Sequence, residues 1–295
     1  MLAVRVKVTV AKEEFIKLLN QGVNSWNSWR ASDPDMRGID LSEIQLEGLD
    51  LTGIDLSMVN LRGAKFHDVN LSSANLRGAD LSKADLKGID LKSSNLGTAH
   101  LSMVCLSEAD LSQANLSGAD LRGSNLRLAK LDLADLSTTK LNMSSLNGAS
   151  MIGTILIGAN LSRAELREAN LAGTDFSRAN LSEADLSHCN LNVSTLVGTD
   201  LIGATLVDID LSESNLTRAN LIGANLYRGN LCGCDLIGAD LRGANCSEAY
   251  FIGADLSRAD LSRAEFTSAN LSKANFSGAN TETTDFQGAI MPDVW

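Results

Sequence analysis

The sequence predicts an all-β solenoid with a short helical cap at its N-terminal end. A five-residue repeat runs from Leu41 to Phe286 without insertion or deletion and places Leu, Phe or Met at nearly every fifth position. Five matches neither the helix period near 3.6 nor the strand period of 2. Each unit must therefore combine a short extended piece with a corner.

Two further features of the unit support this fold class. A small residue stands two positions before Leu, with Asp or Asn between them, as in Ala79-Asp80-Leu81. Such alternation is typical of inward and outward positions on a strand. Gly often stands two positions after Leu, as at Gly53 and Gly243, and supplies the positive φ that a type II turn requires.

The first ten residues read as a one-sided strand. Apolar residues at positions 2, 4, 6, 8 and 10 alternate with Ala3, Arg5, Lys7 and Thr9. The strand either pairs with the first coil of the same molecule or adds to the edge of another chain. The sequence leaves both arrangements open.

Residues 11–32 are predicted to form a helical lid. Their apolar residues follow helical spacing, Glu13 and Glu14 stand early in the segment, and Asp33-Pro34 ends it. Gly22 divides the segment into two helices. A solenoid end exposes its core and its unpaired backbone groups, so a cover is needed there.

The C-terminal end carries larger side chains. Thr281 replaces the central Leu in the last coil, and four aromatic residues gather near it: Phe251, Phe266, Phe276 and Phe286. We expect these rings to close the end and the short tail to fold over it as a plug. The chain thus divides into a strand and cap (1–38), a repeat region (39–288) and a tail (289–295).

Tandem units of the form A(D/N)LXX, such as Ala239-Asp240-Leu241-Arg242-Gly243, resemble the pentapeptide-repeat proteins over residues 39–288. The resemblance implies a right-handed quadrilateral parallel β-helix with four pentapeptides in each coil, or about 12 coils. Leu side chains 20 residues apart would then stack inside the rod. The segment from Gly22 to Arg30 and the closing Ala289 to Asp293 resemble cyanobacterial members of the family.

Composition narrows the possible partners and location. The formal net charge is −11, and contact with nucleic acid requires a basic surface. We therefore expect no direct nucleic-acid ligand. No apolar run approaches the roughly 20 residues that span a bilayer, and the first residues lack the pattern of a secretory signal. We expect no membrane partner and a cytoplasmic location.

The sequence predicts no catalytic residue, cofactor or metal site, and hence no enzyme. Alternation sends one of Cys232 and Cys234 outward and the other inward, so the pair cannot share a metal. The 5 cysteines indicate no disulfide framework. No histidine has a partner at metal or triad spacing. The Asp and Asn positions are interpreted as a solvated face.

The candidate site is a set of apolar residues at positions that the repeat directs to solvent. Exposed apolar clusters often mark contacts, although β-branched residues also simply suit strands and corners. The candidate residues concentrate in the middle coils: Leu128, Leu133, Ile152, Ile155, Ile157, Val193, Val197, Ile202, Val207 and Ile222.

Together these features indicate a non-enzymatic protein-interaction or scaffold module with an unknown protein partner, present as a monomer or weak homodimer. One alternative follows from the resemblance, because some members of the family mimic DNA and bind DNA gyrase. Basic residues such as Lys83, Arg178 and Arg218 interrupt the acidic positions and weaken that interpretation. The other alternative is a passive structural spacer.

Overall fold

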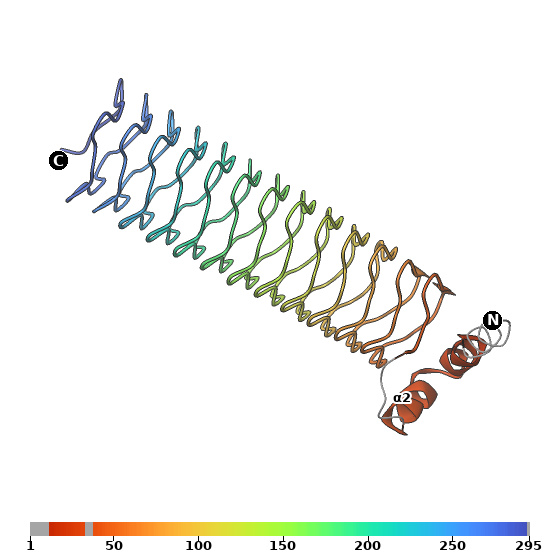
Figure 1. The fold of residues 1–295 in the computed structure, drawn as a ribbon. Helices are drawn as coiled ribbons and strands as arrows, with labels where there is room; N and C mark the ends of the chain where they lie inside the picture. The colour runs from red at the N-terminus through yellow and green to blue at the C-terminus, as the bar shows by residue number, and fades with distance from the viewer. Residues whose placement is uncertain (1–11, 33–37, 294–295) are drawn as a thin grey trace.

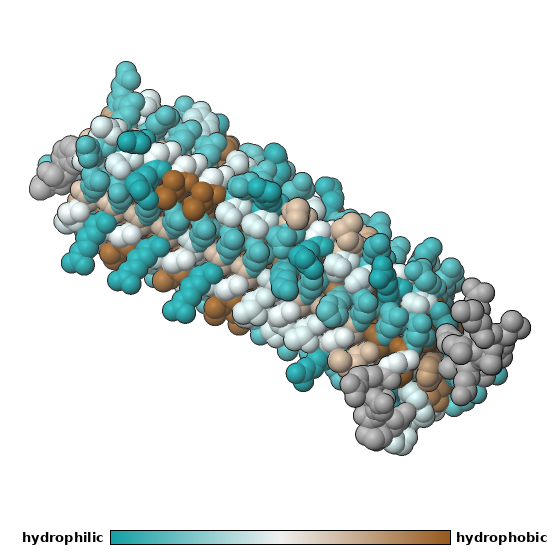
Figure 2. Space-filling model, viewed as in Figure 1, coloured by the Kyte–Doolittle hydropathy of each residue, from teal (hydrophilic) through white to brown (hydrophobic). Residues whose placement is uncertain are grey.

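The computed structural model describes residues 12–32 and 38–293. Over these residues the chain forms a long rod of stacked coils, with a helical segment at one end (Figure 1). The helical segment comprises residues 12–20 and α2 (Val23–Ser32). The visible face of the rod is mostly hydrophilic, with hydrophobic side chains in separate spots (Figure 2). The strand predicted over residues 2–10 lies outside the described residues.

Successive coils pair through parallel bridges between residues 20 positions apart. The bridges run from Asp40 with Asn60 to Asn270 with Ile290. Since 20 residues contain four five-residue units, one coil of the rod is four units. The prediction of a β-helix-like solenoid is confirmed, whereas its right-handed winding and its number of coils stay predictions.

Backbone hydrogen bonds join each coil to the next in both directions. Leu61 N donates to Asp80 O at 2.7 Å, and Asp80 N donates to Val59 O at 3.0 Å. The two segments long enough to be strands, β1 (Gln45–Glu47) and β2 (Lys65–His67), pair in parallel with the same step.

The corners have one backbone conformation throughout the rod. Every fifth residue from Glu43 to Gly288 has a positive φ, between 51° and 71°. The carbonyl of the interior residue accepts from the N–H three positions later, as Leu61 O does from Ala64 N at 3.0 Å. Glycine suits this conformation but is not required, because Val193 adopts a φ of 56°. The ladder bonds on both sides of each corner offset strain of about 1–2 kcal/mol per residue.

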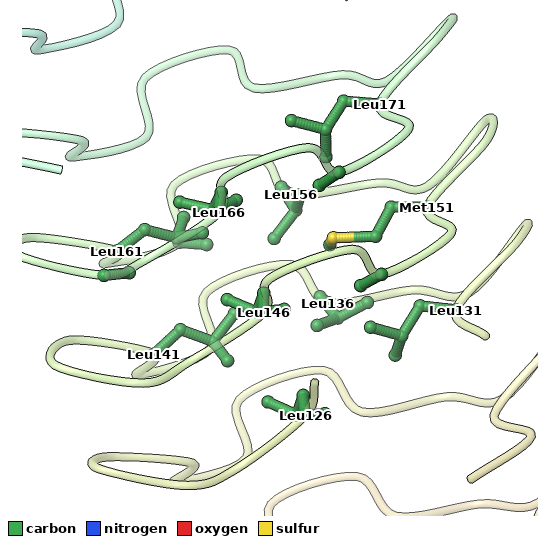
Figure 3. Close-up of a cluster of buried hydrophobic side chains, with 14 of the residues drawn as sticks. Leu126, Leu131, Leu136, Leu141, Leu146, Met151, Leu156, Leu161, Leu166 and Leu171 are labelled. Carbon is green, nitrogen blue, oxygen red and sulfur yellow. The ribbon is translucent and has the colours of Figure 1, made fainter. Parts of the chain in front are cut away.

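The interior is built from stacked apolar columns. Figure 3 shows Leu136 beneath Leu156 and Leu141 beneath Leu161, one coil apart. These side chains are fully buried, as are the small residues that alternate with them. The stacking predicted for residues 20 apart is therefore confirmed. Because each coil buries its Leu side chains mainly against neighbouring coils, the hydrophobic stabilisation depends on the stack.

Hydroxyl side chains replace Ala in one interior column. Thr154, Thr174, Ser194 and Ser214 lie in consecutive coils and are all buried. Their hydroxyls donate to backbone carbonyls inside the rod; Ser214 Oγ, for example, lies 2.7 Å from Leu191 O. A buried hydroxyl that lacks such a partner is costly, so these bonds explain how polar residues fit the core.

The helical segment packs its aromatic side chains on the first coil. Trp26 is fully buried. Its ring centroid lies 6.4 Å from that of Phe15 and 5.4 Å from that of Trp29. Leu19 on the preceding helix is also buried in the same core. The helices predicted for the lid are present in residues 12–20 and in α2.

Polar side chains of this segment occupy ladder positions that a preceding coil would fill. In the body of the rod, the carbonyls that correspond to those of Asp55 and Ser57 accept N–H groups of the coil before. In the first coil, Asp55 O accepts from Trp26 Nε1 and Ser57 O accepts from an Arg30 guanidinium nitrogen, both at 2.6 Å. Asn27 Oδ1 accepts Asp55 N at 2.8 Å. The segment therefore closes the backbone edge with side chains.

The C-terminal end is closed less completely. The centroid of the Phe266 ring lies 5.2 Å from that of Phe251 and 5.5 Å from that of Phe286, so the predicted gathering of rings is confirmed. Met291 packs against the core and Pro292 is buried. Thr281, at the Leu position, is only half-buried. Ile290 is 57% exposed and does not cover the end, and residues 294–295 of the predicted plug lie outside the described residues.

Candidate interaction surface

The Asp and Asn side chains of the repeat serve the corners. Asp80 Oδ1 accepts the backbone N–H of Ser82 at 2.9 Å, and this contact recurs along the rod. Asn side chains also reach the coil before, as Asn60 Nδ2 does to Asp40 Oδ1 at 3.0 Å. Many of these positions are half-buried. They therefore form a half-buried structural ladder rather than the solvated face predicted from the sequence.

One carboxylate of this ladder also holds an arginine. Arg122 donates from Nε to Asp120 Oδ1 at 2.8 Å and from a terminal nitrogen to Oδ2 at 2.6 Å. These charge-assisted hydrogen bonds from Arg122 lower the pKa of Asp120 below its ordinary value. A depressed native pKa contributes stability above the unfolded pKa of about 3.9, and this stability is lost as the pH falls through the native pKa.

We expect Asp120→Asn to lower the free energy of unfolding at pH 7 by about 1 kcal/mol or less, because the pair is partly exposed. The difference from the wild type should shrink below pH 4, where the wild-type carboxyl itself becomes protonated. Urea unfolding of the variant and the wild type at pH 7 and below pH 4 measures this difference in the free energy of unfolding. Asp80→Asn is the control, because Asp80 has no ion pair among the described residues. An equal loss at both pH values for Asp120→Asn would contradict the expectation.

The cysteines and histidines do not form a site. Cys234 is buried, its Sγ donates to Leu211 O at 2.8 Å, and burial raises its pKa to about 12. Cys232 is only half-buried, on the outward side. His188 Nδ1 lies 3.8 Å from Asp208. Within residues 12–32 and 38–293, no three His, Cys, Asp or Glu side chains are arranged to hold a metal. None of the helices in these ranges is long and apolar enough to cross a bilayer.

The predicted apolar residues do lie on the outside of the rod. Leu133 and Val193 are the most accessible, at 62% and 60% exposure. Val197, Val207 and Ile222 are half-buried. The remaining predicted residues are exposed: Leu128, Ile152, Ile155, Ile157 and Ile202.

The 20-residue step separates these residues onto different corners of the coil. On one corner Leu133 N donates to Ile152 O at 2.9 Å, and Val193 lies in the same column as Leu133, three coils further. On the next, Ile155 and Ile157 lie within one unit and Val197 lies two coils beyond Ile157.

The other predicted residues occupy the two remaining corners. Ile202 and Ile222 are stacked in adjacent coils. Leu128 and Val207 belong to the fourth corner but lie almost four coils apart. The predicted residues therefore form several small groups, not one continuous surface.

Two of the leucines cover glycines of the following coil. A Cβ atom added to Gly148 would lie 2.8 Å from Leu128 Cδ2, and one added to Gly153 would lie 2.9 Å from Leu133 Cδ2. Each leucine thus lies flat along its corner, which keeps an apolar surface close to the rod. A partner could pack against these corners without meeting a projecting side chain from the glycine coil.

Other exposed apolar side chains were not among the predicted residues. Met58, Met103, Met143, Tyr250 and Ile252 are all exposed. Ile237, half-buried, lies in the same column as Ile157 and Val197. Positions 157, 197 and 237 differ by multiples of 20, so they share a column once a coil is known to hold four units.

The family model for pentapeptide repeats matches the chain in 8 copies, over residues 39–78, 60–97, 105–142, 144–182, 179–218, 214–245 and 244–280. A search of the curated proteins finds no match.

Several solved structures are similar to this chain. One is HetL, a pentapeptide repeat protein involved in heterocyst differentiation regulation in the cyanobacterium Nostoc, with 33% identity, coverage of 90% of this chain and 95% of that chain, and a TM-score of 0.36. Rfr23 of the cyanobacterium Cyanothece has 28% identity over 49% of this chain and 88% of its own, with a TM-score of 0.20.

A trypsin-treated variant of QnrB1, a plasmid-mediated fluoroquinolone resistance protein, has 17% identity over 87% of this chain and 92% of its own, with a TM-score of 0.19. At TM-scores this low, none of the superpositions adds to what the family model shows.

Proposed function

This chain belongs to the pentapeptide-repeat family, and we propose that it is a non-enzymatic protein-interaction module. Its winding is taken to be right-handed, with about 12 coils, as the family implies. The rod offers long, regular corners on which side chains recur at fixed intervals. Such a surface suits recognition of another macromolecule, and no catalytic family is indicated by the match.

Exposed apolar groups on an otherwise polar rod support this proposal. Leu133 and Ile152 are joined by a ladder bond and are 62% and 44% exposed. Exposed apolar area is costly in water unless a partner covers it. A passive spacer has no need of such groups.

The remaining expectations are part of the same proposal. We take the protein to act in the cytoplasm as a monomer or weak homodimer, with residues 1–38 as its cap, 39–288 as the interaction rod and 289–295 as its tail. Gyrase binding by DNA mimicry is the weaker candidate, because arginines recur along one corner of the rod and would face a site shaped for phosphates.

A capture experiment tests the proposal. The intact protein is compared, in lysate of the source organism, with three variants that place Glu on one corner each: Leu133→Glu with Val193→Glu, Ile157→Glu with Val197→Glu, and Ile202→Glu with Ile222→Glu. We expect at least one protein to be retained by the intact rod and lost with one of the variants. The measurement is quantitative mass spectrometry of the bound proteins.

The matched control carries Thr98→Glu and Gln113→Glu, two exposed polar residues outside the apolar groups. All variants should show the circular dichroism and unfolding midpoint of the intact protein. An identical set of captured proteins for every variant would contradict the interaction proposal and favour the spacer.

A further inference from the structure

One corner of the rod carries arginines and apolar side chains in alternate coils. Arg178, Arg218 and Arg258 occupy the positive-φ position of this corner, each separated from the next by 40 residues. The intervening coils carry Gly at that position and an apolar residue just before it, at Ile157, Val197 and Ile237. We call these six residues the arginine edge.

Backbone bonds fix the order of the arginine edge. Arg178 N donates to Val197 O and Arg218 N donates to Ile237 O, both at 3.0 Å. An arginine in one coil is thus directly bonded to an apolar residue in the next. With about 4.8 Å between stacked strands, neighbouring arginines are about 9.6 Å apart, and an apolar residue lies at the level between them.

The glycines keep the edge flat between the arginines. The Cγ atom of Arg218 lies 3.9 Å from where a Cβ on Gly238 would stand, and Cγ of Arg258 lies 3.8 Å from the same point on Gly278. The aliphatic stems of Arg218 and Arg258 therefore run along the edge over these two glycines, whereas no described side chain covers Gly198 in the coil after Arg178. Ile157 is 40% exposed, and Val197 and Ile237 are half-buried. Figure 2 shows an edge of this kind, with hydrophilic side chains projecting and hydrophobic ones between them.

The three arginines of the arginine edge form no ion pair among the described residues, although the adjoining column carries the exposed Asp235 and the half-buried Asp175 and Asp255. Elsewhere Arg122, Arg163 and Arg242 pair with Asp120, Glu183 and Asp240. Among the described residues, no carboxylate or carbonyl accepts from the guanidinium groups of the arginine edge. The nearby Asp175 and Asp255 instead accept the backbone N–H groups of Ser177 and Ser257, both at 2.9 Å.

Three unpaired arginines in a row on a chain of net charge −11 indicate an acidic partner. A nucleic acid would meet the repulsion of the rest of the rod. An acidic protein segment needs to approach only this edge, and its apolar side chains can cover Ile157, Val197 and Ile237. Charge and hydrophobicity therefore both favour a protein segment.

The spacing selects the conformation of that segment. An amphipathic helix presents a residue to its seam every 3.5 residues, or about 5.3 Å along its axis. The coils rise by about 4.8 Å, so the two repeats drift by only about 2 Å over the four coils from Ile157 to Ile237. An extended strand presents one face every two residues, about 6.7 Å, and falls out of step within two coils.

We propose that the arginine edge binds an amphipathic α-helix of a partner protein, with acidic residues seven apart and apolar residues midway between them. This proposal rests on the proposed function and names the partner class for one corner of the rod. The acidic side chains pair with Arg178, Arg218 and Arg258, and the apolar ones pack on the residues between.

The test uses a synthetic peptide of about 20 residues. It carries Glu at every seventh position, Leu midway between the glutamates, and Ala and Gln elsewhere. Its binding to the full chain is followed by fluorescence anisotropy at low and high salt. We expect saturable binding that weakens as salt rises and that becomes about tenfold weaker or more with Arg178→Glu, Arg218→Glu and Arg258→Glu combined.

Two controls make the result specific. Arg62→Glu, Arg127→Glu and Arg263→Glu together change the net charge equally but lie on other corners, and should bind the peptide like the intact protein. A second peptide with Lys in place of Glu should bind the Arg178, Arg218 and Arg258 variant and not the intact protein.

Three outcomes would overturn the proposal: no binding of the Glu peptide to the intact rod, equal weakening by both triple variants, or tighter binding of a short DNA duplex than of the peptide. In the capture experiment, a protein lost only with the Leu133→Glu and Val193→Glu variant would support the proposed function. It would place the binding site on that corner and not on the arginine edge. The absence of any captured protein would instead remove the proposed function itself.

Discussion

Replacing Leu156 by Asp is expected to unfold the rod, whereas the same replacement at the next residue, Ile157, should leave it folded. Leu156 is fully buried in an interior column, and Ile157 is 40% exposed on the adjoining corner. Removing a buried Leu side chain costs about 2–5 kcal/mol. The carboxylate would in addition be buried without a partner, which brings the loss above about 5 kcal/mol.

Circular dichroism and the urea midpoint of the two variants measure the difference directly. Because the residues are adjacent, local sequence, position along the rod and charge change are the same in both. Only the side of the backbone differs. Similar unfolding midpoints for the two variants would contradict the inward and outward assignment on which the whole fold rests.

A second consequence concerns how far a defect spreads. Each coil is bonded to the one before and the one after, as Ile155 N is to Ala134 O and Leu156 N is to Asp175 O. A coil that cannot form leaves two raw ends within the rod. We therefore expect Leu156→Asp to destabilise the coils on both sides of the substituted one, because each coil of a solenoid is stabilised by its nearest neighbours.

The solenoid was predictable because its information is local and repeated. Leu at every fifth position and the alternation around it define inside, outside and corner for each unit, and each prediction is reinforced by dozens of copies. The corner conformation was only partly predictable. Gly53 and Gly243 predict a positive φ from the residue type alone. Val193 and Leu133 adopt the same conformation because ladder hydrogen bonds to neighbouring coils hold it.

The candidate surface was less predictable because it depends on the number of units in a coil. The repeat alone shows that Leu128, Ile157 and Ile202 point outward, and the structure agrees. Their different corners follow only when four units are assigned to each coil, as the family resemblance implies and the bridges show. Residues 20 apart share a column, and this step is needed to see that Arg178 and Val197 are neighbours.

Side-chain contacts that replace missing backbone contacts could not be foreseen at all. The lid was expected from its helical spacing of apolar residues, including Trp26 and Trp29. The bonds from Arg30 and Asn27 to the first coil depend on the angle at which α2 crosses the coil. The interior bond of Thr174 to Leu171 O likewise follows from packing, since small apolar residues fill most equivalent positions.

The largest effect outside the repeat is expected for Trp26→Ala. The side chain is fully buried between the helical segment and the first coil, and its Nε1 donates to Asp55 O at 2.6 Å. Truncation of a buried Trp costs about 3–5 kcal/mol. The loss falls on the contact between the lid and the rod, which also includes the Arg30 bond to Ser57 O. We expect the lid to detach while the coils remain.

Detachment should expose the end of the rod. The carbonyls of Asp55 and Ser57 then lose their side-chain donors, and the core at this end loses the buried Trp26 side chain. Unpaired strand edges with apolar surface associate with one another. Trp26→Ala should therefore show faster proteolysis before residue 38 and a concentration-dependent larger species in size-exclusion chromatography.

Asn24→Ala is the matched control, because Asn24 lies on α2 with its side chain exposed. Trp26→Phe separates the two contributions of the residue: it keeps most of the packing and removes the bond to Asp55 O, so its loss should be about 1 kcal/mol. If Trp26→Ala stayed monomeric and as resistant to protease as Asn24→Ala, the lid would be an accessory of the rod rather than its closure. If Trp26→Ala instead associates and is cleaved faster than Asn24→Ala, the aromatic cluster is what keeps the helical segment on the end of the rod. The hydrogen bonds of Asn27 and Arg30 to the first coil then depend on that cluster for their geometry.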